Sequence, residues 1–200
     1  MRFQPGQNPN RPVKGSKIRV DPIRKKSDIK KIRNVISKNP LHACLFSIGI
    51  NTGYRISDIL QIEVGQVRDL LQPGGEISIR EKKTGKVRRV TLNETCVNDI
   101  QTLLKSKDYK DDDYLFTSQR GTVLKVPYVS TMVKKWCQSV GLKGNFGSHT
   151  MRKTFGYMKR MDGFSLPLLV QVFGHSSQKQ TLDYLGIMES EIKDVFMGRL

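Results

Sequence analysis

The stretch PLHACLFSIGINTG, residues 40–53, places the tightest limit on how this chain can fold. Proline suits the first turn of a helix, and glycine suits its left-handed exit, so Pro40 and Gly53 mark the two ends of one helix. Apolar residues occupy nearly every face between them, and a helix that is apolar all round has to be buried. We therefore expect this helix at the centre of the domain, with other elements packed around it.

The remaining helical segments carry apolar residues on one face only, as expected for a shell around that centre. Ser27 can cap a helix whose apolar face holds Ile29, Ile32, Val35 and Ile36. Further helix starts are predicted at Ser57, Asn93, Pro127, Ser148, Ser165 and Ser176 or Ser177. Cys44, Cys96 and Cys137 are widely spaced within apolar patterns and are interpreted as small buried hydrophobes, not as a disulfide framework or a zinc site.

Residues 76–92, EISIREKKTGKVRRVTL, predict a β-hairpin. β-Branched residues lie on both sides of a Thr-Gly pair, which favours a tight turn. The fold class is therefore mainly α with a small antiparallel β-sheet, an α+β domain.

The charge of the chain indicates a polyanionic partner. Lys and Arg number 35 against 18 Asp and Glu, which gives a net charge of +17. No apolar run is long enough to cross a bilayer, and the first ten residues lack the apolar core of a signal peptide, so we expect a cytoplasmic protein with no membrane contact.

The first 26 residues are expected to be a flexible basic arm or a remnant linker, followed by one domain over residues 27–200. The first 40 residues hold 12 Lys or Arg and two acidic residues. The arm is rich in Pro, Gly and Asn and poor in apolar residues, so it has little surface to bury. Contact with DNA phosphates through Arg24, Lys25 and Lys26 is the favoured interpretation, and a solvated leader without a partner is the alternative.

Several polar residues interrupt the apolar patterns at chain turns. Arg55 lies between two predicted helices, and His149 and Arg152 are three apart on one helix face. The hairpin brings Lys82, Lys83 and Lys86 to its tip, His175 follows Gly174 at a helix start, and Tyr184 lies one short helix later. Each residue taken alone is more often structural than catalytic, so only their joint occurrence favours a site.

The order and the local sequences of these segments resemble those of the tyrosine recombinase, or phage integrase, family. TGYRISDIL resembles the first arginine box, with Asp58 as the supporting acid, and KKTGK resembles the lysine hairpin, with Lys83 as the best match. SHTMRKTF resembles the His-x-x-Arg box, VFGHSS the Gly-His box and TLDYLGI the nucleophile box. The resemblance extends over roughly residues 27–196 and implies the catalytic-domain fold of that family.

The resemblance implies a site-specific recombinase that acts on double-stranded DNA through a 3′-phosphotyrosine, without ATP, metal or other cofactor. Tyr184 is then the nucleophile, Arg55, Arg152 and His175 stabilise the transition state, Lys83 is the general acid and His149 the general base. Lys82 and Lys86 are further candidates for DNA contact. The resemblance also implies a tetramer on paired DNA sites, and a monomer is possible when the protein is free. An amphipathic C-terminal tail contains Ile192, Val195 and Phe196. It docks either on a neighbouring subunit or on its own domain.

Other interpretations stay open from the sequence. The chain could be a non-recombining DNA-binding regulator or remnant of the same fold, or a type IB topoisomerase-like enzyme that relaxes DNA. It could be a minimal recombinase, or a catalytic domain separated from an N-terminal DNA clamp, which the short basic arm favours slightly. The DNA target, the direction of recombination, accessory factors and activity of the isolated chain are not encoded in any recognisable motif. Tyr184 is expected to lie apart from the arginines when no DNA is bound.

Overall fold

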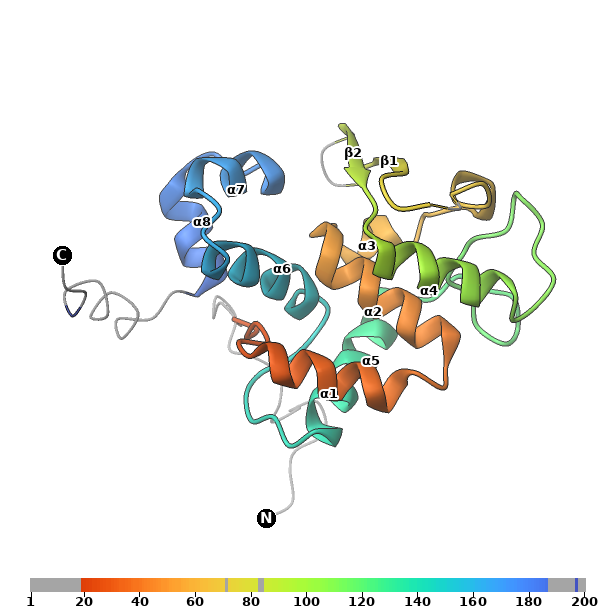
Figure 1. Ribbon diagram of the computed structural model, residues 1–200, viewed down its shortest axis with the longest axis horizontal. Coiled ribbons are helices and arrows are strands. Elements are labelled where there is room, and N and C mark those ends of the chain that lie inside the picture. The colour runs from red at the N-terminus through yellow and green to blue at the C-terminus, as the bar shows by residue number, and fades with distance from the viewer. Residues whose placement is uncertain (1–18, 71, 83–84, 187–196, 198–200) are drawn as a thin grey trace, which may run out of the picture.

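The computed structural model describes residues 19–70, 72–82, 85–186 and 197 of the 200-residue chain (Figure 1). The helices in chain order are α1 (Lys26–Ile36), α2 (Pro40–Thr52), α3 (Ile56–Ile59), the 3₁₀ turn η1 (Val64–Gln66), α4 (Glu94–Leu104), α5 (Val126–Ser139), α6 (Thr150–Met161), α7 (Leu166–Phe173) and α8 (Gln178–Leu185). Strands β1 (Glu76–Arg80) and β2 (Val87–Thr91) pair antiparallel, with Glu76 opposite Thr91 and Arg80 opposite Val87. The predicted fold class, mainly α with a small antiparallel sheet, is confirmed.

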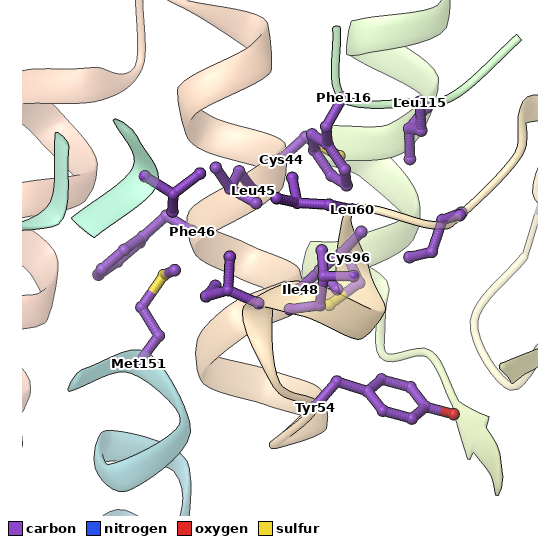
Figure 2. Close-up of a cluster of buried hydrophobic side chains, with 14 of the residues drawn as sticks. Cys44, Leu45, Phe46, Ile48, Tyr54, Leu60, Cys96, Leu115, Phe116 and Met151 are labelled. Atoms are coloured by element: carbon purple, nitrogen blue, oxygen red, sulfur yellow. The ribbon is translucent and has the colours of Figure 1, made fainter. Parts of the chain in front are cut away.

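Helix α2 lies at the centre of the main core, as its all-round apolar pattern predicted. Leu45, Phe46 and Ile48 are fully buried, and α4 and α6 make the most extensive contacts with this helix. Figure 2 shows Met151 of α6 reaching toward the α2 side chains. A Cβ atom added to Gly49 of α2 would lie 2.6 Å from the Met151 sulfur, so the glycine permits this close approach.

A second, smaller core joins α6, α7 and α8. It contains Phe155, Leu169, Phe173 and Leu185, and it is separate from the main core. A Cβ atom on Gly156 of α6 would lie 2.5 Å from side-chain carbons of both Phe173 and Leu185. The missing side chain at residue 156 therefore lets α7 and α8 pack directly on α6.

The hairpin and the α7–α8 pair both rise at the upper edge of the view in Figure 1. The hairpin is anchored on the main core through Ile77 and Ile79, which are buried on one face of β1. The Tyr54 hydroxyl, which points away from the core in Figure 2, donates to the Arg88 carbonyl of β2 at 2.6 Å. The hairpin thus packs on the main core and the α7–α8 pair packs on the smaller core. Residues from both contribute to the site described below.

Helix starts were predicted well where a side chain caps the helix and less well elsewhere. Asn93 and Ser177 accept hydrogen bonds from Cys96 N and Gln180 N, as capping residues do. Ser27 and Ser57 lie inside α1 and α3, because Lys25 and Arg55 provide the extended residue that precedes each helix.

Three residues lie elsewhere than their sequence patterns predicted, and the three cysteines are buried as expected. His149, not Ser148, precedes α6, and His175 lies in the turn between α7 and α8, not at a helix start. Val35 is 54% exposed, although its spacing placed it on the buried face of α1, because that face is narrower than the pattern suggested. Cys44, Cys96 and Cys137 are buried and unbridged, and burial raises the pKa of each thiol.

The end of the predicted basic arm packs on the domain. Ile23 is fully buried, and its amide donates to Thr154 Oγ1 of α6 at 2.8 Å. Asp21 bonds to Asn145 through both backbone and side chain. Residues 20–24 therefore belong to the folded domain, although the domain was predicted to begin at residue 27. The buried Ile23 side chain and these hydrogen bonds hold the segment on the domain. Residues 1–18 and the predicted tail residues Ile192, Val195 and Phe196 lie outside the described residues.

Helices long and apolar enough to cross a membrane are not found in the described part of the chain.

Candidate active site

Arg55 is presented at the junction between α2 and α3, as predicted. Gly53 ends α2 with φ +63°, and Arg55 then takes an extended conformation immediately before α3. A Cβ atom on Gly53 would lie 2.5 Å from the Phe155 ring, so a larger residue would push α6 away. The sharp turn that carries Arg55 therefore also keeps it close to α6.

Two buried carboxylates surround the Arg55 guanidinium. Glu81 Oε2 lies 3.0 Å from Arg55 Nη1, and Asp58 Oδ2 lies 3.8 Å from it. Glu81 Oε1 also lies 3.6 Å from Nη1 of Arg88, whose guanidinium stacks 4.3 Å above the Tyr54 ring. Asp58 is the acid that the sequence predicted here, but Glu81 is the nearer partner, and it links the first arginine to the hairpin.

Arg152 projects from α6 and is only 3% exposed. Its Nη1 donates to the Gly53 carbonyl at the end of α2, and its Nη2 donates to the Phe173 carbonyl at the end of α7 at 2.9 Å. One guanidinium thus ties the main core to the smaller core. Burial lowers the pKa of Arg152 to about 10, with a smaller effect from Arg55 and Arg88, so the group stays charged at neutral pH.

His175 and Tyr184 meet over the Phe173 ring. The His175 ring stacks on Phe173 at 5.2 Å, and the Tyr184 ring meets the His175 ring edge-on at 5.2 Å. The Tyr184 ring centre is 6.0 Å from Arg152 Cζ. The expectation that Tyr184 lies apart from the arginines without DNA is therefore wrong for this structure, because its ring packs with the smaller core that also holds Arg152.

Both rings are in the uncharged state at neutral pH. Burial, and then the charges of Arg152 and Arg55, lower the pKa of His175 to about 4. Burial raises the pKa of Tyr184, and the nearby Arg152 opposes that shift only in part. His175 Nδ1 lies 2.9 Å from Thr181 Oγ1, which leaves Nε2 as the ring nitrogen able to meet a ligand.

Four buried polar atoms in this cluster have no hydrogen-bond partner. They are Arg55 Nη1, Asp58 Oδ2, Arg88 Nη1 and the Tyr184 hydroxyl, and they are all of the unsatisfied buried side-chain atoms found in the described ranges. Arg55 Nη1 is within ion-pair distance of Glu81, but the pair does not have hydrogen-bond geometry. Buried polar groups are normally satisfied, so four exceptions in one place indicate a site built for a polar ligand.

His149 is exposed and immediately precedes α6, whereas Arg152 is buried one turn into that helix. It borders a cavity of about 580 Å³ that is also lined by Tyr184, Lys153 and Ser177. His149 thus shares a cavity wall with Tyr184, and the Tyr184 ring also lies near Arg152 and His175.

The predicted basic contacts are divided among several places. Lys83 lies outside the described residues. Lys82 and Lys86 are exposed. The Lys82 amide donates to Asp58 Oδ1 at 3.1 Å, so the acid that faces Arg55 also holds the end of the hairpin. Arg24 instead reaches the Gly186 carbonyl at 2.7 Å, and Lys26 pairs with Asp162 at 2.7 Å. Lys25 is exposed at the start of α1.

Three site residues were missed by sequence reasoning: Glu81, Arg88 and Lys153. Glu81 follows Ile77 and Ile79 in the alternating inward register of β1, which is a signal that could have identified it. Arg88 and Lys153 carried no such signal. Groups of three or more His, Cys, Asp or Glu residues that could hold a metal do not occur in the part of the chain that the structure describes.

The lowered pKa of His175 predicts a stability change in acid. Between pH 6.5 and pH 4 the unfolded chain takes up a proton at His175 and the folded chain does not, so stability falls as the pH drops through this window. For a half-buried ring we expect a loss on the order of 1–2 kcal/mol, reduced in His175→Gln. Urea unfolding across this pH range, with NMR titration of the His175 ring, provides the measurement. A folded-state titration near 6.5 would contradict the prediction.

The fold is that of a tyrosine recombinase catalytic domain. A model of the phage integrase family matches residues 14–190. The chain is 32% identical over 180 residues to the probable integrase/recombinase YoeC of Bacillus subtilis strain 168, covering 88% of this chain and 95% of that protein. This chain belongs to the phage integrase family.

Solved structures have the same fold. The XerA recombinase superposes with a TM-score of 0.75 at 23% identity, covering 90% of this chain and 67% of that one. XerH bound to a palindromic difH substrate in a post-cleavage complex gives 0.72 at 22% identity, covering 90% and 53%. In sequence the chain is 28% identical to XerH of Campylobacter jejuni and covers 53% of its length, so it spans about half of that relative.

Proposed function

We propose that this protein is a site-specific recombinase that cleaves and rejoins double-stranded DNA through a 3′-phosphotyrosine at Tyr184, without ATP or metal. The observation that carries the proposal is the convergence of unsatisfied polar atoms from Arg55, Arg88 and Tyr184 beside Arg152 and His175. A phosphodiester supplies negative oxygens for the arginines and an electrophile for the tyrosine. Family membership supports the same class of reaction.

The arginines act by stabilising charge in the transition state. Negative charge accumulates on the non-bridging phosphate oxygens as a nucleophile attacks, and fixed guanidinium donors in a buried site offset it without having to reorganise. Two of the five N–H groups of Arg152 are occupied by carbonyls, which fixes its plane and leaves the others for phosphate. The Thr181 hydroxyl has two acceptors within reach, the Ser177 carbonyl at 3.4 Å and His175 Nδ1 at 2.9 Å; in the tautomer in which it donates to Nδ1, the neutral His175 ring donates through Nε2.

The chemical step exchanges one phosphorus–oxygen bond for another. The Tyr184 oxygen bonds to phosphorus, the bond from phosphorus to the 5′ oxygen breaks, and the bond energy is kept in the phosphotyrosine, so no ATP is needed. His149 takes the phenol proton and Lys83 gives a proton to the leaving 5′ oxygen. A base is needed because burial raises the pKa of Tyr184. Attack by a 5′ hydroxyl from a partner strand reverses the step and exchanges strands.

The partner is double-stranded DNA, and the assembly is a tetramer on paired sites formed from monomers in the cytoplasm. The net charge of +17 supports a polyanionic partner, and a related XerH structure contains its difH substrate. Lys82 and Lys86 at the hairpin and the basic residues before residue 27 are the proposed DNA contacts outside the site. Arg24 has a structural role as well, because it bonds to Gly186.

The proposal is tested by trapping the intermediate. The protein is incubated with a library of duplexes that carry random sequence and a nick, which lets the cleaved fragment diffuse away. Covalently bound DNA is recovered under denaturing conditions and sequenced, and the modified peptide is identified by mass spectrometry. We expect a 3′-phosphate linked to residue 184; DNA that is retained under native conditions and entirely released on denaturation would leave a DNA-binding regulator as the function.

Lys83 as the general acid predicts chemical rescue. Lys83→Ala should slow cleavage of an ordinary strand by roughly 10²–10⁴-fold, the usual effect of losing a general acid. A strand with sulfur at the 5′ leaving position should be cleaved at nearly the normal rate, because a thiolate leaves without a proton. The matched variants are Lys82→Ala and Lys86→Ala. Rescue in one of these instead of Lys83→Ala would transfer the role to that lysine.

A further inference from the structure

A basic cavity lies on the side of Tyr184 that faces away from the arginine cluster. It has a volume of about 580 Å³ and is bordered by α6, α8 and the segment before α1. Four basic side chains line it, Arg19, His149, Lys153 and Lys179, against a single carboxylate, Asp183. The mechanism proposed above uses only His149 from this set, which leaves three cations without a role.

Lys153 is the unusual member of this set, because the residue is only 6% exposed and yet its ammonium nitrogen is not among the fully buried atoms without a partner, so the charged end opens into the cavity. Within the described ranges, no carboxylate lies at ion-pair distance from its ammonium group and no hydrogen bond to that group is found. Its ammonium nitrogen lies 5.3 Å from the centre of the Tyr184 ring. Buried charges are normally paired, as Asp58 and Glu81 are by Arg55 in the same site.

Partial burial of the Lys153 side chain has an electrostatic consequence. It lowers the pKa of Lys153, and the charge of Asp21 compensates only in part. The Asp21 carboxylate is itself occupied by the Asn145 amide at 2.8 Å. A bound anion would restore the balance, and a phosphate oxygen accepts charge-assisted hydrogen bonds from ammonium groups.

The position of the cavity defines which anion fits. Arg152 and Lys153 are consecutive in α6, so their side chains leave the helix about 100° apart and reach Tyr184 from different directions. A DNA strand whose scissile phosphate lies against Arg152 continues past Tyr184 and carries another phosphate toward Lys153. The arrangement therefore suits two successive phosphates of one strand with Tyr184 between them.

We propose that this cavity binds the phosphodiester next to the one that Tyr184 attacks, with Lys153 as its principal cation and Arg19 and Lys179 as outer contacts. The proposal rests on the proposed function for the position of the scissile phosphate. Binding here orients the strand relative to Tyr184, so Lys153 is a positioning residue. Free inorganic phosphate has the same chemistry, and the experiment separates the two sources.

The test follows Lys153 directly by NMR in protein labelled with ¹³C at the lysine ε-carbons, with signals assigned through Lys153→Arg and Lys105→Arg. The probes are inorganic phosphate, a thymidine trinucleotide with two phosphodiesters, and the same trinucleotide with one neutral methylphosphonate. Lys105 is the internal control, because it is exposed at the end of α4. Chloride at equal ionic strength controls for screening.

We expect the trinucleotide to shift the Lys153 signal in a saturable way, and the methylphosphonate to bind at least about tenfold more weakly, since one charge-assisted hydrogen bond is lost. Lys153→Gln should weaken trinucleotide binding similarly, measured on the Lys179 signal, and Lys105→Gln should not. A Lys153 signal that moves no more than that of Lys105, or that follows inorganic phosphate alone, would overturn the proposal. The test needs no strand cleavage, so failure to trap an adduct leaves its result unaffected.

Discussion

Tyr184→Phe is expected to lower the rate of covalent adduct formation by roughly 10⁴-fold or more, because it removes the only oxygen proposed to attack phosphorus. The same change should keep the fold intact. The ring packs against Phe173 and His175, and phenylalanine preserves both contacts. The Tyr184 hydroxyl is buried without a hydrogen-bond partner among the described residues, so its removal should raise the free energy of unfolding by about 1 kcal/mol.

The opposite signs of these two effects make the prediction specific. A residue kept for packing alone would lose stability on truncation, whereas a nucleophile held in an unsatisfied environment loses activity and gains stability. Tyr109→Phe is the matched control, because its hydroxyl donates to the Leu115 carbonyl at 3.4 Å, away from the site. It should keep adduct formation and gain no stability. An undiminished adduct in Tyr184→Phe would move the nucleophile to another residue.

Arg152→Ala is expected to have the second-largest combined effect, since it lowers both the rate of cleavage and the free energy of unfolding. Loss of one fixed donor to a developing negative charge typically slows catalysis by about 10²–10³-fold. The variant also leaves the Gly53 and Phe173 carbonyls without their donor and removes the tie between the two cores. We expect a loss on the order of 3 kcal/mol in the free energy of unfolding.

Arg152→Lys separates these two contributions. It keeps the charge, but a single ammonium group cannot reproduce the planar fork that bonds both carbonyls and still faces phosphate. Cleavage should fall by about 10²-fold in a protein that remains folded. The pKa of His175 should rise above its value of about 4 in Arg152→Ala but much less in Arg152→Lys, because the charge of Arg152 contributes to lowering it.

Cleavage assays, urea unfolding and NMR titration of His175 provide the three readouts. Arg160→Lys is the control on the same helix, since Arg160 is exposed near its end. Unchanged cleavage in Arg152→Lys would show that charge at this position suffices and that the fork geometry does not matter.

Much of the architecture follows from local sequence signals. The central helix begins at Pro40 and ends before Gly53, as its pattern predicted. The two strands of the hairpin lie on either side of the Thr-Gly pair in the sequence, also as predicted. Proline, glycine and alternating β-branched residues act within a few positions of one another, so their effects can be read without knowledge of distant contacts. Val35 and Ile23 were misjudged, because burial depends on which neighbour covers a residue.

The candidate site was predictable in its members but not in its arrangement. Arg55, His149, Arg152, His175 and Tyr184 were selected because their spacing resembles a family whose reaction needs those residue types in that order. Arg88 and Lys153 were not, since a single charged residue in a sequence is indistinguishable from a solvated one, and Glu81 was missed although it continues the inward alternation of Ile77 and Ile79. Their importance lies in burial and in distances to other chain segments.

By itself, the sequence determined the residue types, their order along the chain, the central helix, the hairpin and the strong positive charge. The tertiary structure alone decided that Tyr184 packs beside Arg152, that Glu81 joins Arg55 to the hairpin, and that Lys153 lines a basic cavity next to Tyr184. The physical reason is that electrostatic energy depends on distance and on solvent exposure. Both quantities are set by packing between segments that are far apart in the chain.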